Sequence, residues 1–189
     1  MLIRLSEYGK MLLIEGLISA GKVEFNKLMR IFKEIAPSSI IQMMNGSVIL
    51  GYDHVLFAVL NALKATNNNR MICDEPALEI LVYASAQRQI KNSVEMLGVK
   101  EDTKHLILVA ISESQTELER LKETISEIKD LTLDSSFLNS CDDEKLSWTK
   151  KIFRISAAEL QSIRRVTLSE REALERLVVE RIAVLAVNV

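Results

Sequence analysis

Residues 51–99 contain two apolar runs of helical length, and this stretch constrains the fold more than any other part of the sequence. The first run reads HVLFAVLNALKA and follows Asp53, a residue type that favours helix N-caps. Because positions 55–60 are all apolar, this helix is expected to be largely buried. The second run starts at Pro76, which suits a first helical turn, and continues to Gly98, which favours a helix end. Both helices are therefore expected to belong largely to the core.

Each of these helices also carries a line of polar side chains. In the first, His54, Asn61 and Lys64 are spaced by seven and ten residues, which places them within one stripe of an α-helix. In the second, polar residues recur every four positions along one edge, at Glu79, Tyr83, Gln87 and Lys91. The sequence thus predicts a wet polar stripe on each of two otherwise apolar helices.

The rest of the chain alternates between apolar segments of strand length and amphipathic helices. Strands are predicted as two short segments in residues 1–18, as a strand or a hairpin turning at Asn45-Gly46 in residues 40–50, in residues 106–111, and in the final AVLAV run. Helices are predicted for residues 22–36, 113–130 and 169–182, the last two with capping boxes at Thr116/Glu119 and Ser169/Glu172. Residues 131–140 show no clear period, which is typical of a mobile surface loop. These elements predict an α/β fold in which several helices cover a small mixed β-sheet.

Length and composition favour a single globular domain over residues 1–189. With 48% hydrophobic and 26% charged residues, the chain has the composition of an ordinary folded protein. The two cysteines, Cys73 and Cys141, fit neither a disulfide framework nor a metal cluster and are expected as small buried apolar residues. Charges interrupt the N-terminal apolar segments, and no apolar run reaches the ~20 residues of a membrane span. A cytoplasmic protein with no membrane contact is therefore expected.

The net charge bears on whether the protein binds nucleic acid. The net charge of −2 argues against a general attraction to nucleic acid, so any contact with RNA must be local. The charged residues in 113–144 are mostly acidic. The following segment is basic and sets one carboxylate, Glu159, against six cations: Lys145, Lys150, Lys151, Arg154, Arg164 and Arg165. These cations are expected to pair within the protein rather than to touch phosphate.

The residues expected of an enzyme are scarce. Neither the GxGxxG pattern nor a Walker phosphate loop occurs in the sequence. The two histidines, His54 and His105, lie 51 positions apart, with no cysteine or carboxylate near either at the spacing of metal ligands. The sequence therefore predicts no metal site, no cofactor and no catalytic residue, and it favours binding over catalysis.

The central stretch and the C-terminal run resemble a known family. The segments ILGYDHVLFAVLNALKA, LEILVYASAQRQIKNSVEMLGVK and LERLVVERIAVLAV are similar to the TPRKB-type (PRPK-binding) subunit of the KEOPS tRNA-modification complex, most specifically at ASAQRQI. The resemblance implies a small α/β domain with no active site of its own. Such a subunit binds the kinase-like ATPase subunit and helps to recruit tRNA through its 3′ CCA end, in support of threonylcarbamoyladenosine modification. Residues 131–168 are longer and less familiar than the family pattern and are expected as a loop plus helix insertion to which no function is transferred.

The polar stripes suit such a role, because single-stranded RNA ends are held by local positive charge, stacking surfaces and hydrogen bonds. The RNA-binding residues predicted in this way are His54, Asn61, Lys64, Arg70, Tyr83, Gln87, Arg88 and Lys91. Tyr83 supplies the ring on which a base would stack. Arg88 fits a place inside the protein equally well, since it falls in register with Leu81 and Ala84. His54 and Lys64 also fit the polar edge of a helix that has no function.

By the same resemblance, the surface that faces the kinase-like subunit uses Val94, Leu97, Val178 and Ile182, although ordinary core packing explains each of them as well. Two other functions stay open. An adaptor that binds only protein predicts an exposed apolar patch without adjacent cations. A small enzyme assembled from distant residues predicts a deep pocket with strongly perturbed titrating groups.

Overall fold

The computed structural model describes residues 1–140, 142–164 and 169–187. It divides the chain into two compact units, one formed by Met1–Gly46 with Gly98–Phe137 and the other by Ser47–Leu97 with Leu138–Val189. The described residues form a five-stranded sheet and a larger number of helices, so the predicted α/β class is confirmed. The assignment of residues 1–189 to a single domain stays a prediction.

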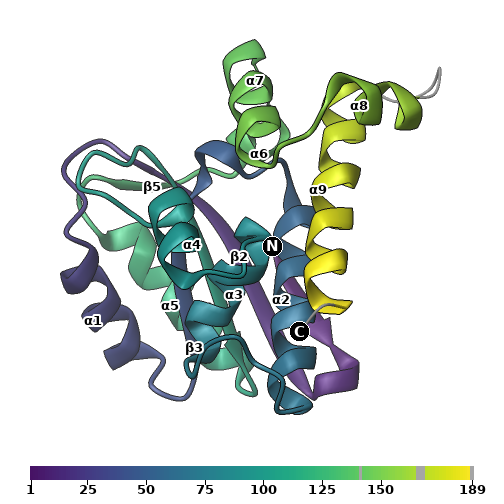
Figure 1. Cartoon of the computed structure of the whole chain (residues 1–189). Helices are drawn as coiled ribbons and strands as arrows, with labels where there is room; N and C mark the ends of the chain where they lie inside the picture. Colours follow the sequence, from purple (N-terminus) through teal and green to yellow (C-terminus); the bar gives the residue numbers. More distant parts are fainter. Residues whose placement is uncertain (141, 165–168, 188–189) are drawn as a thin grey trace. The chain divides into compact units, whose positions relative to one another are not determined.

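The first unit contains the sheet (Figure 1). Its strands are β1 (Leu2–Leu5), β2 (Lys10–Ser19), β3 (Ile40–Asn45), β4 (His105–Ser112) and β5 (Leu131–Leu133). Four of them run in the order β1-β2-β4-β3, and β5 pairs with the far end of β2, from Leu17 to Ser19. All four pairings of these strands are antiparallel, whereas a mixed sheet was predicted. The two short N-terminal strands are confirmed, and Gly9 turns between them with a φ of 62°.

Alternate strand residues point toward α1 (Phe25–Ile35) and α5 (Gln115–Glu127), because side chains of a strand alternate between the two faces of a sheet. The core on this face is made of apolar residues: Leu13, Leu17, Leu28, Phe32, Ile41, Met43, Leu106, Leu108, Ala110, Leu118, Leu121 and Ile125. The intervening residues of the central strands, such as Leu12, Ile14 and Val109, are buried as well. The nearly continuous apolar sequences of β2 and β4 follow from this burial on both faces.

A close approach at Gly16 fixes residues 134 and 135 on β2. The Gly16 N–H donates to Ser135 Oγ at 2.8 Å, and the Asp134 N–H donates to the Gly16 carbonyl at 3.0 Å. A Cβ at Gly16 would lie 2.7 Å from the Ser135 Cα, so only glycine fits this approach. Together with β5 and the short α6 (Ser136–Asn139), these bonds show that the mobile loop predicted for residues 131–140 is wrong.

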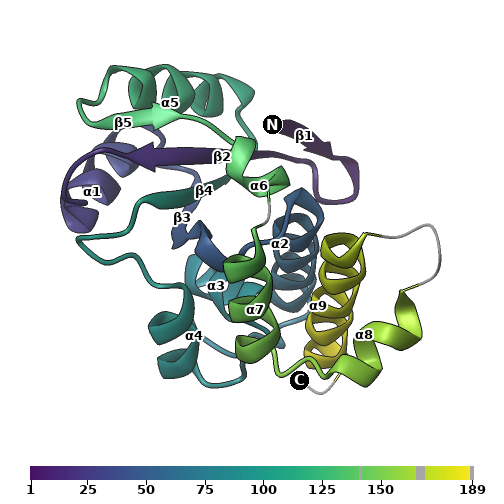
Figure 2. The ribbon, with the colours of Figure 1, turned by 90° about the horizontal axis from the view of Figure 1, so that it is seen from above.

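The second unit is helical, with α2, α3 and α9 packed together and α9 also contacting α7 and α8 (Figure 2). Its helices are α2 (Tyr52–Asn67), α3 (Pro76–Ser85), α4 (Ile90–Leu97), α7 (Asp143–Ile152), α8 (Ala157–Ile163) and α9 (Glu170–Val187). The start at Pro76 and the end before Gly98 are confirmed. None of the described helices is long and apolar enough to cross a membrane.

The single helix predicted from Pro76 to Gly98 is wrong, because the chain breaks at Ala86. This residue has a φ of 50°, in the left-handed region, and its N–H donates to the Tyr83 carbonyl at 2.9 Å. The Ser85 hydroxyl donates to the Ser93 hydroxyl at 2.8 Å across the break. The polar edge expected from Glu79 to Lys91 is therefore divided between two helices.

Three smaller predictions also fail. The AVLAV run is the last part of α9 and not a strand. Residues following Asn45 form the 3-10 turn η2 (Gly46–Val48) in place of a hairpin. The N-cap of α5 is Ser114, whose hydroxyl accepts the Glu117 N–H, so no capping box forms at Thr116. By contrast, the capping box of α9 is confirmed. The Glu172 N–H donates to Ser169 Oγ at 3.2 Å, and the Ser169 N–H donates to Glu172 Oε2 at 2.8 Å.

Internal pairing accounts for part of the basic segment. Lys150 and Arg164 both form ion pairs with Glu170 at the start of α9. Lys151 instead lies over the Trp148 ring, 5.2 Å from its centroid. Arg165 and Cys141, both considered from the sequence, lie outside the described residues.

Candidate functional site

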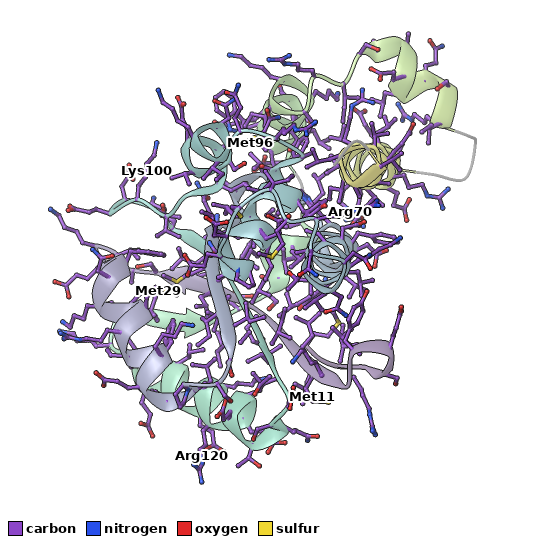
Figure 3. All side chains as sticks on the ribbon, turned by 60° about the horizontal axis from the view of Figure 1, so that its bottom comes forward. Met11, Met29, Arg70, Met96, Lys100 and Arg120 are labelled. Atoms are coloured by element: carbon purple, nitrogen blue, oxygen red, sulfur yellow. The ribbon has the colours of Figure 1, made fainter. Side chains whose placement is uncertain are left out.

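An open pocket of about 470 Å³ lies in the helical unit, where α2, α3 and α9 come together. Its lining residues are Asn61, Lys64, Ala65, Asn68, Arg70, Tyr83, Ala183, Ala186 and Val187. Figure 3 labels Arg70 close to α2 and α9, from which most of the other lining residues come. Four of the eight predicted RNA-binding residues are thus gathered in one pocket, namely Asn61, Lys64, Arg70 and Tyr83.

The pocket carries positive charge that no described carboxylate neutralises. Lys64 and Arg70 are exposed at its rim, and neither forms an ion pair with a described residue. None of the nine described lining residues is acidic. Two unpaired cations over a partly apolar pocket can attract an anionic ligand locally, even though the protein as a whole has a net charge of −2.

A tight turn at the end of α2 places Arg70 beside Lys64. The Asn68 N–H donates to the Lys64 carbonyl at 3.1 Å, and the Arg70 N–H donates to the Ala65 carbonyl at 2.9 Å. Between them Asn69 adopts a φ of 53°, a left-handed conformation that asparagine accepts more readily than most residues. The backbone therefore reverses within a few residues, and this brings the Arg70 side chain back to the helix from which the chain has just emerged.

The segment after Arg70 is anchored by a buried carboxyl group. Glu79 is completely buried, and its side chain accepts the N–H groups of Ile72 and Cys73 at 3.0 Å each. The Cys73 thiol donates to the same carboxyl group at 2.9 Å. Burial, and then the bond to Glu79, raises the pKa of Cys73 to about 12. This cysteine is therefore a hydrogen-bond donor in the native fold and not a nucleophile.

Tyr83 lies at the inner end of the pocket. The residue is only 2% exposed, so its ring cannot offer a face on which a base stacks, and the predicted stacking role is wrong. Its hydroxyl makes no hydrogen bond to a described residue. Every described side-chain oxygen that lacks a partner is accessible to solvent, and this includes the Tyr83 oxygen. The Tyr83 oxygen is therefore reached from the pocket. Burial, and then the nearby charge of Glu79, raises the pKa of the Tyr83 phenol.

His54 lies in the core and not on a wet stripe, so its predicted place in an RNA-binding groove is wrong. It is completely buried, with its ring edge-on to Phe153. The Leu50 N–H donates to Nδ1 at 3.4 Å, and Nε2 lies 2.8 Å from the Ala84 carbonyl. This pattern assigns the proton to Nε2, which donates to Ala84 at the end of α3. His54 thus joins the start of α2 to the end of α3.

The burial of His54 predicts acid sensitivity. Desolvation lowers the pKa of its imidazole to about 4, so between about pH 6.5 and 4 the unfolded chain binds a proton that the native fold excludes. Stability is thus complete above this range and falls as the pH drops through it, by about 2 to 3 kcal/mol at pH 4.5. NMR titration of the His54 ring is expected to show it neutral well below pH 6, with a parallel loss in urea stability. An imidazole that titrates near 6.5 in the folded protein contradicts this.

The other three predicted RNA-binding residues lie outside the pocket. Gln87 is half-buried in the break between α3 and α4, and Arg88 and Lys91 are exposed beside it. The exposure of Arg88 rules out the buried position that its register had suggested. The predicted groove is therefore replaced by a smaller pocket, with three polar residues elsewhere on the surface.

The predicted partner surface is mostly core. Leu97, Val178 and Ile182 are completely buried, so in this structure they have no face to offer a partner. Val94 is 46% exposed and lies one helical turn from Ile90, which is 37% exposed. Of the four predicted interface residues, only Val94 is available on the surface.

The sequence prediction missed five lining residues, although signals for them exist. Asn68 belongs to the segment TNNN, residues 66–69, a polar cluster typical of a turn after a helix. Ala183, Ala186 and Val187 share one helical face through spacings of three and four, but the run had been interpreted as a strand. Ala65 is the last residue of the run HVLFAVLNALKA, which was expected only to be largely buried.

Metal binding has no support in the described part of the chain. No group of three or more histidine, cysteine, aspartate or glutamate side chains there is arranged to hold a metal ion. The chemistry of the pocket is instead that of hydrogen bonding and charge.

Comparisons with known proteins identify the family of this chain. A search of curated proteins found no match. The family model described as kinase binding protein CGI-121 matches residues 23–186, which is most of the chain and includes eight of the nine described residues that line the pocket. The resemblance to TPRKB-type proteins seen in the sequence is confirmed by this match. The chain belongs to the CGI-121 family of kinase-binding proteins.

Proposed function

We propose that this protein is a non-catalytic KEOPS subunit that binds the kinase-like ATPase subunit and the 3′ CCA end of tRNA, in support of threonylcarbamoyladenosine formation. Membership of a kinase-binding family supports the first partner. The pocket between α2, α3 and α9 supports the second. The KEOPS assignment rests on the sequence resemblance.

The observation that carries the RNA proposal is a partly apolar pocket with two cations that no described residue neutralises. Lys64 and Arg70 provide charge at the rim, and the amides of Asn61 and Asn68 provide hydrogen-bond donors and acceptors. A volume of about 470 Å³ falls in the range of roughly 300–1,000 Å³ that is typical of small-ligand pockets. A single-stranded RNA end combines phosphates with small planar bases and fits such a site, whereas a duplex needs a broad basic face.

This pocket also separates the proposal from its alternatives. A protein-only adaptor gives no reason for two cations beside a pocket whose described lining residues include no carboxylate. An enzyme needs a nucleophile or a general acid and base within the site. Of the nine described lining residues, only Lys64, Arg70 and Tyr83 carry ionisable side chains, and neither Lys64 nor Arg70 has an ion-pair or hydrogen-bond partner among the described side chains that would make it a general base.

The double variant Lys64→Ala, Arg70→Ala is expected to bind intact tRNA at least about tenfold more weakly, since charge-assisted hydrogen bonds are among the strongest polar contacts. Wild type is expected to bind tRNA lacking its CCA end weakly, and the double variant should bind this RNA no worse than wild type does. Because wild type is expected to neutralise only two phosphates, a plot of the logarithm of its affinity for intact tRNA against the logarithm of the salt concentration should have a slope of about −1.4.

A matched control is the double variant Arg88→Ala, Lys91→Ala, which removes the same charge from exposed positions outside the pocket. It should retain wild-type affinity for intact tRNA, as measured by fluorescence anisotropy on proteins checked by circular dichroism. If both double variants lose affinity equally, RNA contacts the protein through general charge and not through this pocket. If wild type binds both RNAs equally, the CCA assignment fails.

A further inference from the structure

Tyr83 is an almost completely buried residue, and no contact in the described part of the chain accounts for its hydroxyl group. Tyr83 is 2% exposed, and its neighbour in register, Glu79, directs its carboxyl group to Ile72 and Cys73. No hydrogen bond joins the Tyr83 hydroxyl to any described residue, although the oxygen is reached from the pocket. Buried tyrosine hydroxyls usually find a partner, so an external one is indicated here.

The environment makes this hydroxyl a donor. Burial and the charge of Glu79 both raise the pKa of the phenol, so it keeps its proton at physiological pH. Because Glu79 already accepts two backbone N–H groups and a thiol, the proton of Tyr83 is left for a ligand. A fixed donor at the inner end of a pocket requires an acceptor atom on whatever enters.

The shape of the pocket indicates which part of an RNA end reaches that donor. The exposed cations Lys64 and Arg70 are suited to phosphate, which is strongly hydrated and stays near solvent. Three of the lining residues are alanines, Ala65, Ala183 and Ala186, and their small side chains leave room for a planar ring. An acceptor at the inner end is thus a ring nitrogen or carbonyl oxygen of a base.

We propose that the Tyr83 hydroxyl donates a hydrogen bond to an acceptor atom of one nucleobase in the bound RNA end and so determines base recognition in this pocket. The inference rests on the proposed function, because it assumes that the ligand is an RNA end. It assigns Tyr83 a hydrogen-bonding role that differs from stacking, since a stacking platform needs an exposed ring face.

The test is the variant Tyr83→Phe, which removes one oxygen and keeps the buried ring. Affinity for intact tRNA is expected to fall about two- to tenfold, the range for loss of one neutral hydrogen bond. Tyr52→Phe is the matched control, because it removes the same atom from a half-buried residue that does not line the pocket. It should leave affinity unchanged.

A second arm identifies the contacted base from the RNA side. Three tRNAs, each with an abasic residue at one position of the CCA end, are titrated into wild type and Tyr83→Phe. One of them should bind both proteins equally, because its acceptor is absent. The inference is overturned if Tyr83→Phe weakens binding of all three abasic tRNAs as much as it weakens binding of intact tRNA. It is also overturned if the variant binds intact tRNA with unchanged affinity.

The two proposals fail in different ways. If Lys64→Ala, Arg70→Ala weakens binding of intact tRNA while Tyr83→Phe does not, the pocket binds RNA without a base contact from Tyr83. If wild type does not distinguish tRNA with and without CCA, the proposed function itself is wrong. Should Tyr83→Phe prove unstable, the comparison of abasic RNAs on wild type still decides, because equal affinity for intact and all three abasic tRNAs excludes base recognition.

Discussion

Replacing Glu79 with alanine is expected to lower the free energy of unfolding by about 3 to 5 kcal/mol. The carboxyl group accepts the N–H groups of Ile72 and Cys73 and the Cys73 thiol, and it is completely buried. Without it, these donors have no acceptor and little access to water, and each buried unsatisfied group costs about 1 to 3 kcal/mol. Urea denaturation followed by circular dichroism measures the loss.

Two further variants separate the hydrogen bonds from other effects. Glu79→Gln keeps the volume but offers one acceptor oxygen in place of two, so an intermediate loss is expected. Glu75→Ala is the control, because Glu75 is exposed at the start of α3 and its side chain makes no capping bond. Equal stability of Glu79→Ala and Glu75→Ala would show that the carboxyl group does not anchor this segment.

The anchor also bears on the pocket, since Arg70 lies two residues before Ile72. Freeing residues 72 and 73 gives Arg70 more conformations in the unbound protein, and the entropy lost on binding then increases. We therefore expect Glu79→Gln to weaken binding of intact tRNA as well as stability, while Glu75→Ala leaves both unchanged.

Much of the fold follows from local sequence patterns. The short, continuous apolar run at residues 106–111 predicted a buried strand, and it is confirmed as β4. Pro76 marks the start of a helix as expected. The break at Ala86 carries no such signal, because alanine is the best helix former and rarely adopts a positive φ. Its conformation is imposed by tertiary contacts such as the bond between Ser85 and Ser93.

The end of the chain was misinterpreted for a different reason. The run AVLAV is apolar and short, and periodicity alone does not separate a buried strand from the end of a buried helix. It continues the helix that starts at the Ser169 capping box, so the assignment to α9 needed the full length of the segment.

The candidate site was predicted in part, and the errors have a geometric cause. In a helix with 3.6 residues per turn, His54 and Lys64 differ by about 80° around the axis, so a stripe that includes both is wide enough to cross from core to surface. Lys64 lies at the solvent edge of that stripe. Asn61 lies only about 20° from His54 around the axis, but it is two turns further along α2, where it lines the pocket, whereas the end of α3 covers His54. The burial of Glu79 and Tyr83 was not predicted, because polar residues at every fourth position were interpreted as one exposed edge of a helix.

Glutamate is expected to have very different effects on stability at two positions of α4, one in the core and one on the surface that a partner can use. Leu97 is completely buried, so Leu97→Glu removes a packed side chain and places a charge without a partner in the core. A loss of at least about 4 kcal/mol is expected, which is a large part of the roughly 5 to 15 kcal/mol by which native domains are stable. Val94 is 46% exposed on the same helix, and Val94→Glu should change the free energy of unfolding by less than about 0.5 kcal/mol.

The pair of variants then tests where the kinase partner binds. If the exposed apolar residues Ile90 and Val94 belong to that surface, Val94→Glu weakens association with the kinase-like subunit while the protein stays folded, because a charge buried in an apolar interface is costly. Glu95→Ala provides the control, since Glu95 is an exposed neighbour on α4 whose truncation introduces no charge. Co-purification and isothermal titration measure association, and thermal unfolding reports the fold. A folded Val94→Glu variant with unchanged affinity would exclude this face of α4, and a folded Leu97→Glu variant would mean that Leu97 is not core.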